Sequence, residues 1–148
     1  MRVAIYNAQK HCSIDRKRVV RLVEGVLQAE KHQCGEVAIH FVCSQRISWL
    51  HAKYFGDPAV TDCISFPIDG TEAGPYSVLG EVFVCPETAS HYIAEHGGDL
   101  YEEIALYVVH GLLHLLGYDD IEESDQAAMR LQEQFHMKNL KSQALLLQ

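Results

Sequence analysis

The pattern of apolar and polar positions along the chain predicts three clear strands, one brief extended segment and five helices. The expected strands are 2–6, 37–43 and 78–85, and the extended segment is 63–67. The expected helices are 14–31 after a Ser13 cap, 45–55, 86 to the Gly97-Gly98 pair, 100–116 capped by Asp99 with Glu102, and 122–137. Because strands come early and helices late, we expect an α+β layered domain with a mostly helical C-terminal half.

The composition is that of an ordinary globular protein, so we expect one domain over residues 1–148. Hydrophobic residues make up 48% and charged residues 22%, which argues against a disordered chain or a coiled coil. The formal net charge of −8 excludes a protein that coats nucleic acid generally, so an RNA contact needs a local patch or a metal. The longest apolar run, 104–116, is too short to span a bilayer and no signal peptide is visible, so no membrane partner is expected.

The cysteines indicate a reducing compartment. There are five, an odd number, widely spaced and without a C-x-x-C pair: Cys12, Cys34, Cys43, Cys63 and Cys85. This pattern excludes a complete disulfide framework and a cysteine zinc knuckle. We therefore expect reduced thiols packed as small apolar side chains, no disulfide partner and a cytoplasmic location.

Two further features have competing interpretations. The densest basic cluster lies in the first turns of the helix predicted at 14–31, and it consists of Arg16, Lys17, Arg18 and Arg21. In an acidic chain it is the best local candidate for an RNA contact, although such a run also suits a solvated helix face. Trp49 is expected to belong to the core and not to a base-stacking platform.

The helix predicted at 100–116 carries the pattern that points to chemistry. His110 and His114 are four residues apart, so both imidazoles lie on one face of an otherwise apolar helix. Gly117 allows the chain to turn back, which brings residue 120 towards the same ion as a third ligand. This spacing is similar to the zinc site of metzincins, but Gly111 stands where those proteases have their general-base glutamate. A metal site is therefore expected, and a metallopeptidase is disfavoured.

Three sequence blocks connect this helix with a known family. Residues 110–119 match every fixed position of H-G-x-L-H-L-x-G-Y-D-H before its final histidine, residues 61–67 resemble T-[DN]-V-L-S-F-P, and residues 79–82 resemble L-G-[DE]-I. With Met129, the resemblance covers roughly residues 45–135. On these blocks the chain resembles the YbeY family of bacterial metal-dependent endoribonucleases.

The resemblance implies a small mixed sheet of about four strands packed with about five helices, and a zincin-like helix carrying the metal. It implies an endoribonuclease of rRNA maturation and ribosome quality control, which acts on single-stranded RNA with partners on the small ribosomal subunit. We expect one Zn²⁺ per chain on His110, His114 and Asp120, whose coordinated water supplies the nucleophile. The family pattern implies that Asp119 supports the metal ligands and does not bind the ion itself. It also places Thr61 and Ser65 in the lining of the cleft. The alternative for these two hydroxyl groups is a hydrogen bond to the backbone of their own loop.

The chain departs from the family pattern at two positions. Asp120 replaces a histidine; this lowers the site charge by one unit, so the coordinated water should ionise at higher pH. In the segment 50–56, which resembles L-N-x-x-Y-R-G, Phe55 takes the place of an arginine expected to contact phosphate. Charge stabilisation at the scissile phosphate would then need Lys53, Arg46 or the metal alone. Both departures favour the main alternative, a ribosome-assembly or binding factor with a structural metal and weak or no nuclease activity.

Overall fold

The computed structural model describes residues 1–71 and 74–147. In chain order the elements are β1 (Arg2–Ala8), α1 (Arg16–Ala29), β2 (Glu36–Val42), α2 (Ser44–Phe55), β3 (Cys63–Pro67), β4 (Val78–Val84), α3 (Pro86–His96), α4 (Leu100–Leu115) and α5 (Glu123–Ser142). The strands form one sheet in the order β1-β2-β4-β3, with β1, β2 and β4 parallel and β3 antiparallel to β4. Over the described residues, the predicted mixed sheet of four strands with five helices is confirmed.

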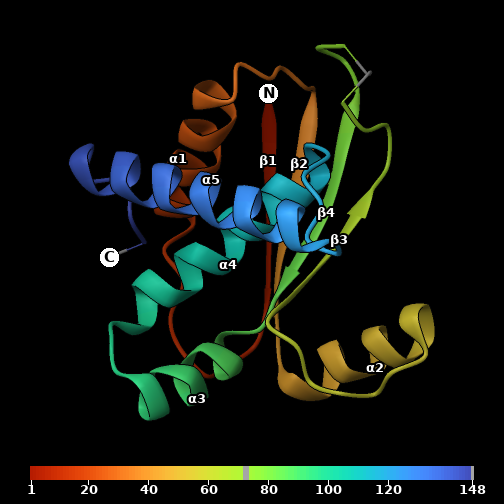
Figure 1. Ribbon diagram of the computed structural model, residues 1–148, viewed down its shortest axis with the longest axis vertical. Coiled ribbons are helices and arrows are strands. Elements are labelled where there is room, and N and C mark those ends of the chain that lie inside the picture. Colours follow the sequence, from red (N-terminus) through yellow and green to blue (C-terminus); the bar gives the residue numbers. More distant parts are fainter. Residues whose placement is uncertain (72–73, 148) are drawn as a thin grey trace.

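The sheet separates two unequal layers of helices (Figure 1). Helices α1, α4 and α5 lie on one side of the sheet and enclose the main core, while α2 lies on the other side. The smaller core under α2 is formed by Ile47 and Leu50 against Ile64 and Cys85. The face of the central strands towards the main core is therefore apolar, whereas the face that carries α2 also bears the polar pair His40 and Glu81.

Helix α4 is the central element of the larger layer, and its backbone approaches β4 closely. Nine of its residues are buried, as expected for a helix that is apolar almost all round. A Cβ atom at Gly111 would lie 2.4 Å from Val82 Cγ1, so only glycine fits there. Ser65 Oγ on β3 donates a hydrogen bond of 2.8 Å to the Gly111 carbonyl oxygen. The glycine beside His110 is therefore a packing requirement of the sheet.

A buried polar network connects α1, the end of α4 and α5. The Glu30 carboxylate accepts hydrogen bonds from Tyr118 Oη (2.8 Å) and Gln132 Nε2 (2.5 Å) and contacts His136 Nε2 at 2.6 Å. Burial raises the pKa of Glu30, but these hydrogen bonds outweigh it, so the pKa lies below its ordinary value. The network fixes α5 against the turn that follows α4.

Several predicted boundaries were wrong. Helix α1 begins at Arg16 and is capped by Asp15, whose carboxylate accepts from the backbone N–H of Lys17 and Arg18. Ser13 therefore lies before the helix, because an aspartate two residues later satisfies the free N–H groups. The last helix continues beyond residue 137 to Ser142, where Leu140 is still buried against the core.

Two burial predictions also need correction. Trp49 is 49% exposed, because Ile47 and Leu50 are the α2 residues that pack on the sheet and the opposite side of α2 faces solvent. Cys43 is exposed at the start of α2, whereas Cys34 and Cys85 are buried. All five cysteines are free. Among the described residues, no helix combines the length and the apolar character that crossing a membrane requires.

Candidate metal centre

The structure brings the three predicted ligand residues together. His110 and His114 lie one turn apart on α4, with their Nε2 atoms 3.0 Å from each other. The helix ends at Leu115, and Gly117, with a φ of 98°, lets the chain reverse so that Tyr118 N–H bonds back to the Leu113 carbonyl. This turn places Asp120 Oδ2 3.4 Å from both Nε2 atoms. We call His110, His114 and Asp120 the metal triad.

The donor set and its spacing fit a small divalent ion. Two imidazoles and one carboxylate are ligands that zinc and other transition metals accept. Bonds of about 2.0–2.1 Å in a tetrahedral site place neighbouring ligand atoms about 3.3 Å apart, close to the separations of 3.0 and 3.4 Å in the triad. All three residues are half-buried, so a bound ion would remain reachable for a substrate.

Glu133 on α5 contacts the outer ring nitrogen of His110. Its Oε1 lies 2.9 Å from His110 Nδ1, the ring nitrogen that faces away from the triad. Burial lowers the pKa of His110, but the Glu133 hydrogen bond and the charges of nearby carboxylates outweigh it, so the pKa is raised. A carboxylate on the outer nitrogen fixes the tautomer that presents Nε2 to a metal.

Sequence reasoning missed Glu133, although α5 carried a usable signal. Met129, His136 and Leu140 are the buried residues of this helix, and Glu133 lies on the same stripe at helical spacing. An acid within an otherwise buried stripe needs a partner. Only the packing of α5 on α4 shows that the partner is His110.

The other residues predicted around the site have different positions. Asp119 Oδ1 accepts hydrogen bonds from the backbone N–H of Asp120 and Ile121, so it shapes the turn that presents Asp120. Ser65 bonds α4 backbone and also lines a hollow beside His114. Thr61 Oγ1 instead donates to Asp62 Oδ1 at 3.3 Å.

The hollow beside the metal triad has a volume of about 290 Å³. We call it the triad hollow, and its lining consists of His51, Phe55, Cys63, Ile64, Ser65, Pro67 and His114. Phe55 is 58% exposed, so its ring is open to solvent. A substrate that reached the triad from this side would pass an aromatic ring.

The predicted cationic residues lie outside this hollow. Arg46 and Lys53 face the ring of Trp49, at 4.7 and 4.8 Å from its centroid, and line a separate groove on α2. In the basic cluster of α1, Arg16 donates to the Ile5 carbonyl and Arg18 donates to the Leu146 carbonyl.

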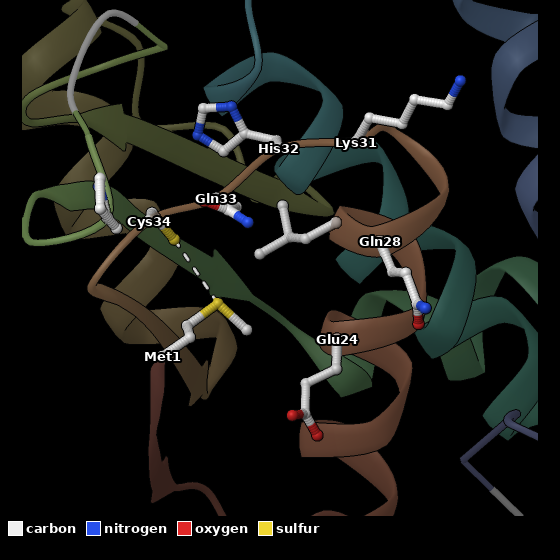
Figure 2. Close-up of a pocket in the computed structure, with 9 residues that line it drawn as sticks. Met1, Glu24, Gln28, Lys31, His32, Gln33 and Cys34 are labelled. Carbon is white, nitrogen blue, oxygen red and sulfur yellow. Dashed lines mark hydrogen bonds between the residues drawn. The ribbon is translucent and has the colours of Figure 1, made fainter.

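A larger cavity of about 820 Å³ shares no lining residue with the triad hollow. Figure 2 shows its lining, with Cys34 Sγ hydrogen-bonded to Met1 Sδ at 3.5 Å and Glu24 and Gln28 on the wall formed by α1. Among the described residues, the triad is the group of three side chains close enough together to hold a metal ion. The chemistry of this chain is therefore expected at the triad and not in the larger cavity.

A family model described as endoribonuclease YbeY matches residues 4–141. The chain belongs to the endoribonuclease YbeY family. It is 53% identical over 120 residues to the endoribonuclease YbeY of Protochlamydia amoebophila, covering 81% of this chain and 80% of that protein. It is 41% identical over 148 residues to the one of Chlamydia muridarum, covering 97% and 91%.

A solved structure shares the fold. The solution structure of a protein from Thermotoga maritima aligns with a TM-score of 0.67 and 22% identity, covering 96% of this chain and 91% of that one. The YbeY family consists of hydrolases known for rRNA maturation. The resemblance drawn from the sequence blocks is therefore confirmed at the level of family, fold and enzyme class.

Proposed function

We propose that this chain is a zinc-dependent endoribonuclease that cleaves single-stranded rRNA in the cytoplasm. The proposal assigns the whole activity to one domain over residues 1–148, with one Zn²⁺ held by His110, His114 and Asp120. The observation that carries it is the convergence of these three side chains beside an open hollow, with Glu133 bonded to the outer nitrogen of His110. When bound, zinc lowers the pKa of a coordinated water and stabilises charge on the phosphate.

Three further side chains keep the metal ligands in position. Glu133 keeps the Nδ1 side of His110 occupied, so that Nε2 remains free to act as a ligand. Asp119 holds the turn by accepting the N–H of Asp120, and Ser65 anchors α4 at the wall of the triad hollow. Both contacts reduce the freedom of the ligands before substrate arrives.

Peptidase chemistry is opposed by packing as well as by sequence. A general-base glutamate would have to replace Gly111, and any side chain there meets Val82 at 2.4 Å. The chain therefore has no room for the carboxylate that metzincins place beside their first histidine.

We further propose the 3′ end of small-subunit rRNA as the substrate and the small ribosomal subunit as the partner. This part rests on the family resemblance of the sequence blocks at 61–67, 79–82 and 110–119. The acidic net charge of −8 favours single strands that reach into a local site over extended binding to duplex RNA.

A ribosome-assembly factor with a structural metal is the second candidate. It is favoured by Phe55, which presents an apolar ring to the triad hollow, and by Arg46 and Lys53, which face Trp49 and not the triad. Such a protein would bind zinc and RNA but would cleave RNA weakly or not at all.

One set of variants separates these functions. Zinc content and cleavage of a fluorescent single-stranded RNA are measured for wild type, His114→Ala, Asp120→Ala and the control His91→Ala, an exposed histidine of α3. We expect the two triad variants to lose both zinc and cleavage and His91→Ala to keep both. Equal zinc in wild type and the triad variants would refute the metal assignment. Full zinc without cleavage in wild type would support the assembly factor.

A further inference from the structure

The face of the sheet that carries α2 presents a continuous row of rings. Tyr6 on β1, His40 on β2 and Phe83 on β4 are cross-strand neighbours in the register of the sheet. Their rings stack, with centroids 4.7 Å apart between the first two and 4.2 Å apart between the last two. Phe66 on β3 continues the row, 5.7 Å from Phe83. One ring from each strand thus crosses the whole sheet.

Helix α2 adds exposed rings and two cations to the end of this row. Trp49 and Tyr54 are 49% and 55% exposed, and Tyr54 packs edge-on to Phe66 at 4.9 Å. Arg46 and Lys53 lie within 5 Å of the Trp49 ring centroid, one turn before and after it. Exposed rings with cations beside them are the combination that binds single-stranded nucleic acid through stacking and phosphate contacts.

These groups surround a groove of about 390 Å³, which we call the α2 groove. Its lining includes Arg46, Trp49, Lys53, Tyr54, Phe66 and Phe83. One acid, Glu81, also lines it, but its carboxylate contacts His40 Nε2 at 2.9 Å. The groove therefore presents two cations against one carboxylate that already has a partner.

Phe55 connects the α2 groove with the triad hollow. It lines the hollow together with His114, and its ring lies nearly parallel to that of Phe66, at 25° and 6.4 Å. Phe66 in turn lines the α2 groove. The two hollows share no lining residue, but this ring pair makes them neighbours, so an RNA strand with a phosphodiester at the triad would meet the groove next.

We propose that the α2 groove binds the part of a single-stranded RNA next to the cleavage position, with bases stacked on Trp49 and Phe55 and phosphates paired with Arg46 and Lys53. The inference rests on the proposed function for the position of the scissile bond. RNA is favoured over a protein partner because two cations lie beside exposed rings in a chain of net charge −8, and because Phe66 of the groove lies next to Phe55 of the triad hollow.

Trp49 itself provides a direct readout, since it is the chain's single tryptophan. The full chain with His114→Ala, which should not cleave, is titrated with an unlabelled single-stranded oligoribonucleotide of about ten nucleotides. We expect saturable quenching of the Trp49 fluorescence, and much weaker quenching with a duplex of the same length. Absence of quenching at concentrations that saturate binding would overturn the proposal.

The affinity of the same RNA is then measured by fluorescence anisotropy. Trp49→Ala and Phe55→Ala, each made in the His114→Ala chain, are expected to weaken binding roughly 5- to 150-fold, because a stacked base is typically worth about 1–3 kcal/mol. Trp49→Phe keeps a ring and should recover most of the loss. Phe135→Ala removes a ring of similar exposure (51%) from α5 and should bind like the parent chain. If the Trp49 and Phe55 variants also bind like Phe135→Ala, the groove does not hold RNA, and a protein partner becomes the occupant to test.

The charge contacts have a matched comparison on α1. Lys53→Gln should reduce the slope of log affinity against log salt by about 0.7, the value for one phosphate contact with a single strand. Lys17→Gln removes the same charge from the basic cluster of α1 and should leave the slope unchanged. A slope that changes with Lys17 and not with Lys53 would place the RNA on α1 and overturn the proposal.

Cleavage by wild type separates this inference from the proposed function. If wild type cleaves RNA but Trp49 in the His114→Ala chain is not quenched, the binding role of the α2 groove is refuted and the endoribonuclease proposal remains. Quenching, with the expected loss for Phe55→Ala but no cleavage by zinc-loaded wild type, would support the groove and refute the endoribonuclease.

Discussion

The contact between Glu133 and His110 allows a sharp test of the metal centre. The carboxylate is 16% exposed and lies 2.9 Å from His110 Nδ1, so it makes a largely desolvated hydrogen bond to a proposed ligand. Glu133→Gln keeps the shape and one acceptor oxygen but removes the charge. Outer partners of this kind typically change metal affinity by 10- to 100-fold, about 1.4–2.7 kcal/mol, and we expect Glu133→Gln to weaken zinc binding within that range.

The pH dependence of this loss follows from the raised pKa of His110. Zinc must displace the proton from His110, so its apparent affinity falls as pH falls below that pKa. Removing the Glu133 charge lowers the pKa of His110, so a smaller fraction of His110 is protonated in the variant at acidic pH. The variant therefore recovers part of its deficit in zinc affinity there. The loss should therefore be largest at alkaline pH, where His110 is neutral in both proteins.

The assay is competition with a fluorescent zinc chelator at several pH values, with thermal unfolding as a check on the fold. Glu95→Gln, which removes an exposed carboxylate from α3, serves as the control and should bind zinc like wild type. Zinc affinity of Glu133→Gln equal to that of Glu95→Gln at alkaline pH would show that Glu133 does not support a metal ligand. A deficit that grows towards acidic pH would contradict the argument from the pKa of His110.

Three further predictions concern packing, the polar network and the third ligand. Gly111→Ala should lower the free energy of unfolding by about 1–3 kcal/mol, because the added Cβ meets Val82 Cγ1. The control is Gly74→Ala, whose Cβ would have no atom within 4 Å, and in a thermal scan it should unfold like wild type. Glu30 has a lowered pKa, so the stability it contributes is present above the pKa of the unfolded chain and is lost as pH falls through the pKa of the folded chain. In denaturant unfolding, Glu30→Gln should therefore be less stable than wild type at neutral pH, by an amount that shrinks in acid. A stability difference independent of pH would refute this. Asp120→His raises the site charge by one unit and should move the midpoint of the pH–rate profile for RNA cleavage to lower pH, and an unchanged midpoint would count against Asp120 as a ligand.

Local patterns were sufficient to predict the element order and the metal triad. The two histidines of α4 are four residues apart and Asp120 follows after one glycine turn, so helix geometry and the freedom of Gly117 bring all three together with little help from the rest of the fold. Errors at element ends, such as the cap at Asp15 in place of Ser13, arose because two capping residues compete within a few positions.

The contacts around that triad depended on tertiary structure. Glu133 reaches His110 only because α5 packs across α4, and a sequence separation of 23 residues carries no local signal of that approach. The exposure of Trp49 was decided in the same way: α2 packs on the sheet through Ile47 and Leu50, which leaves its opposite side to solvent. Local sequence is enough to say which side chains meet within one helix and the turn after it, because backbone geometry sets those distances. Which elements pack against that helix, and which surface stays exposed, depends on how the apolar faces of all the helices and strands are buried against one another, so it follows only from the folded structure.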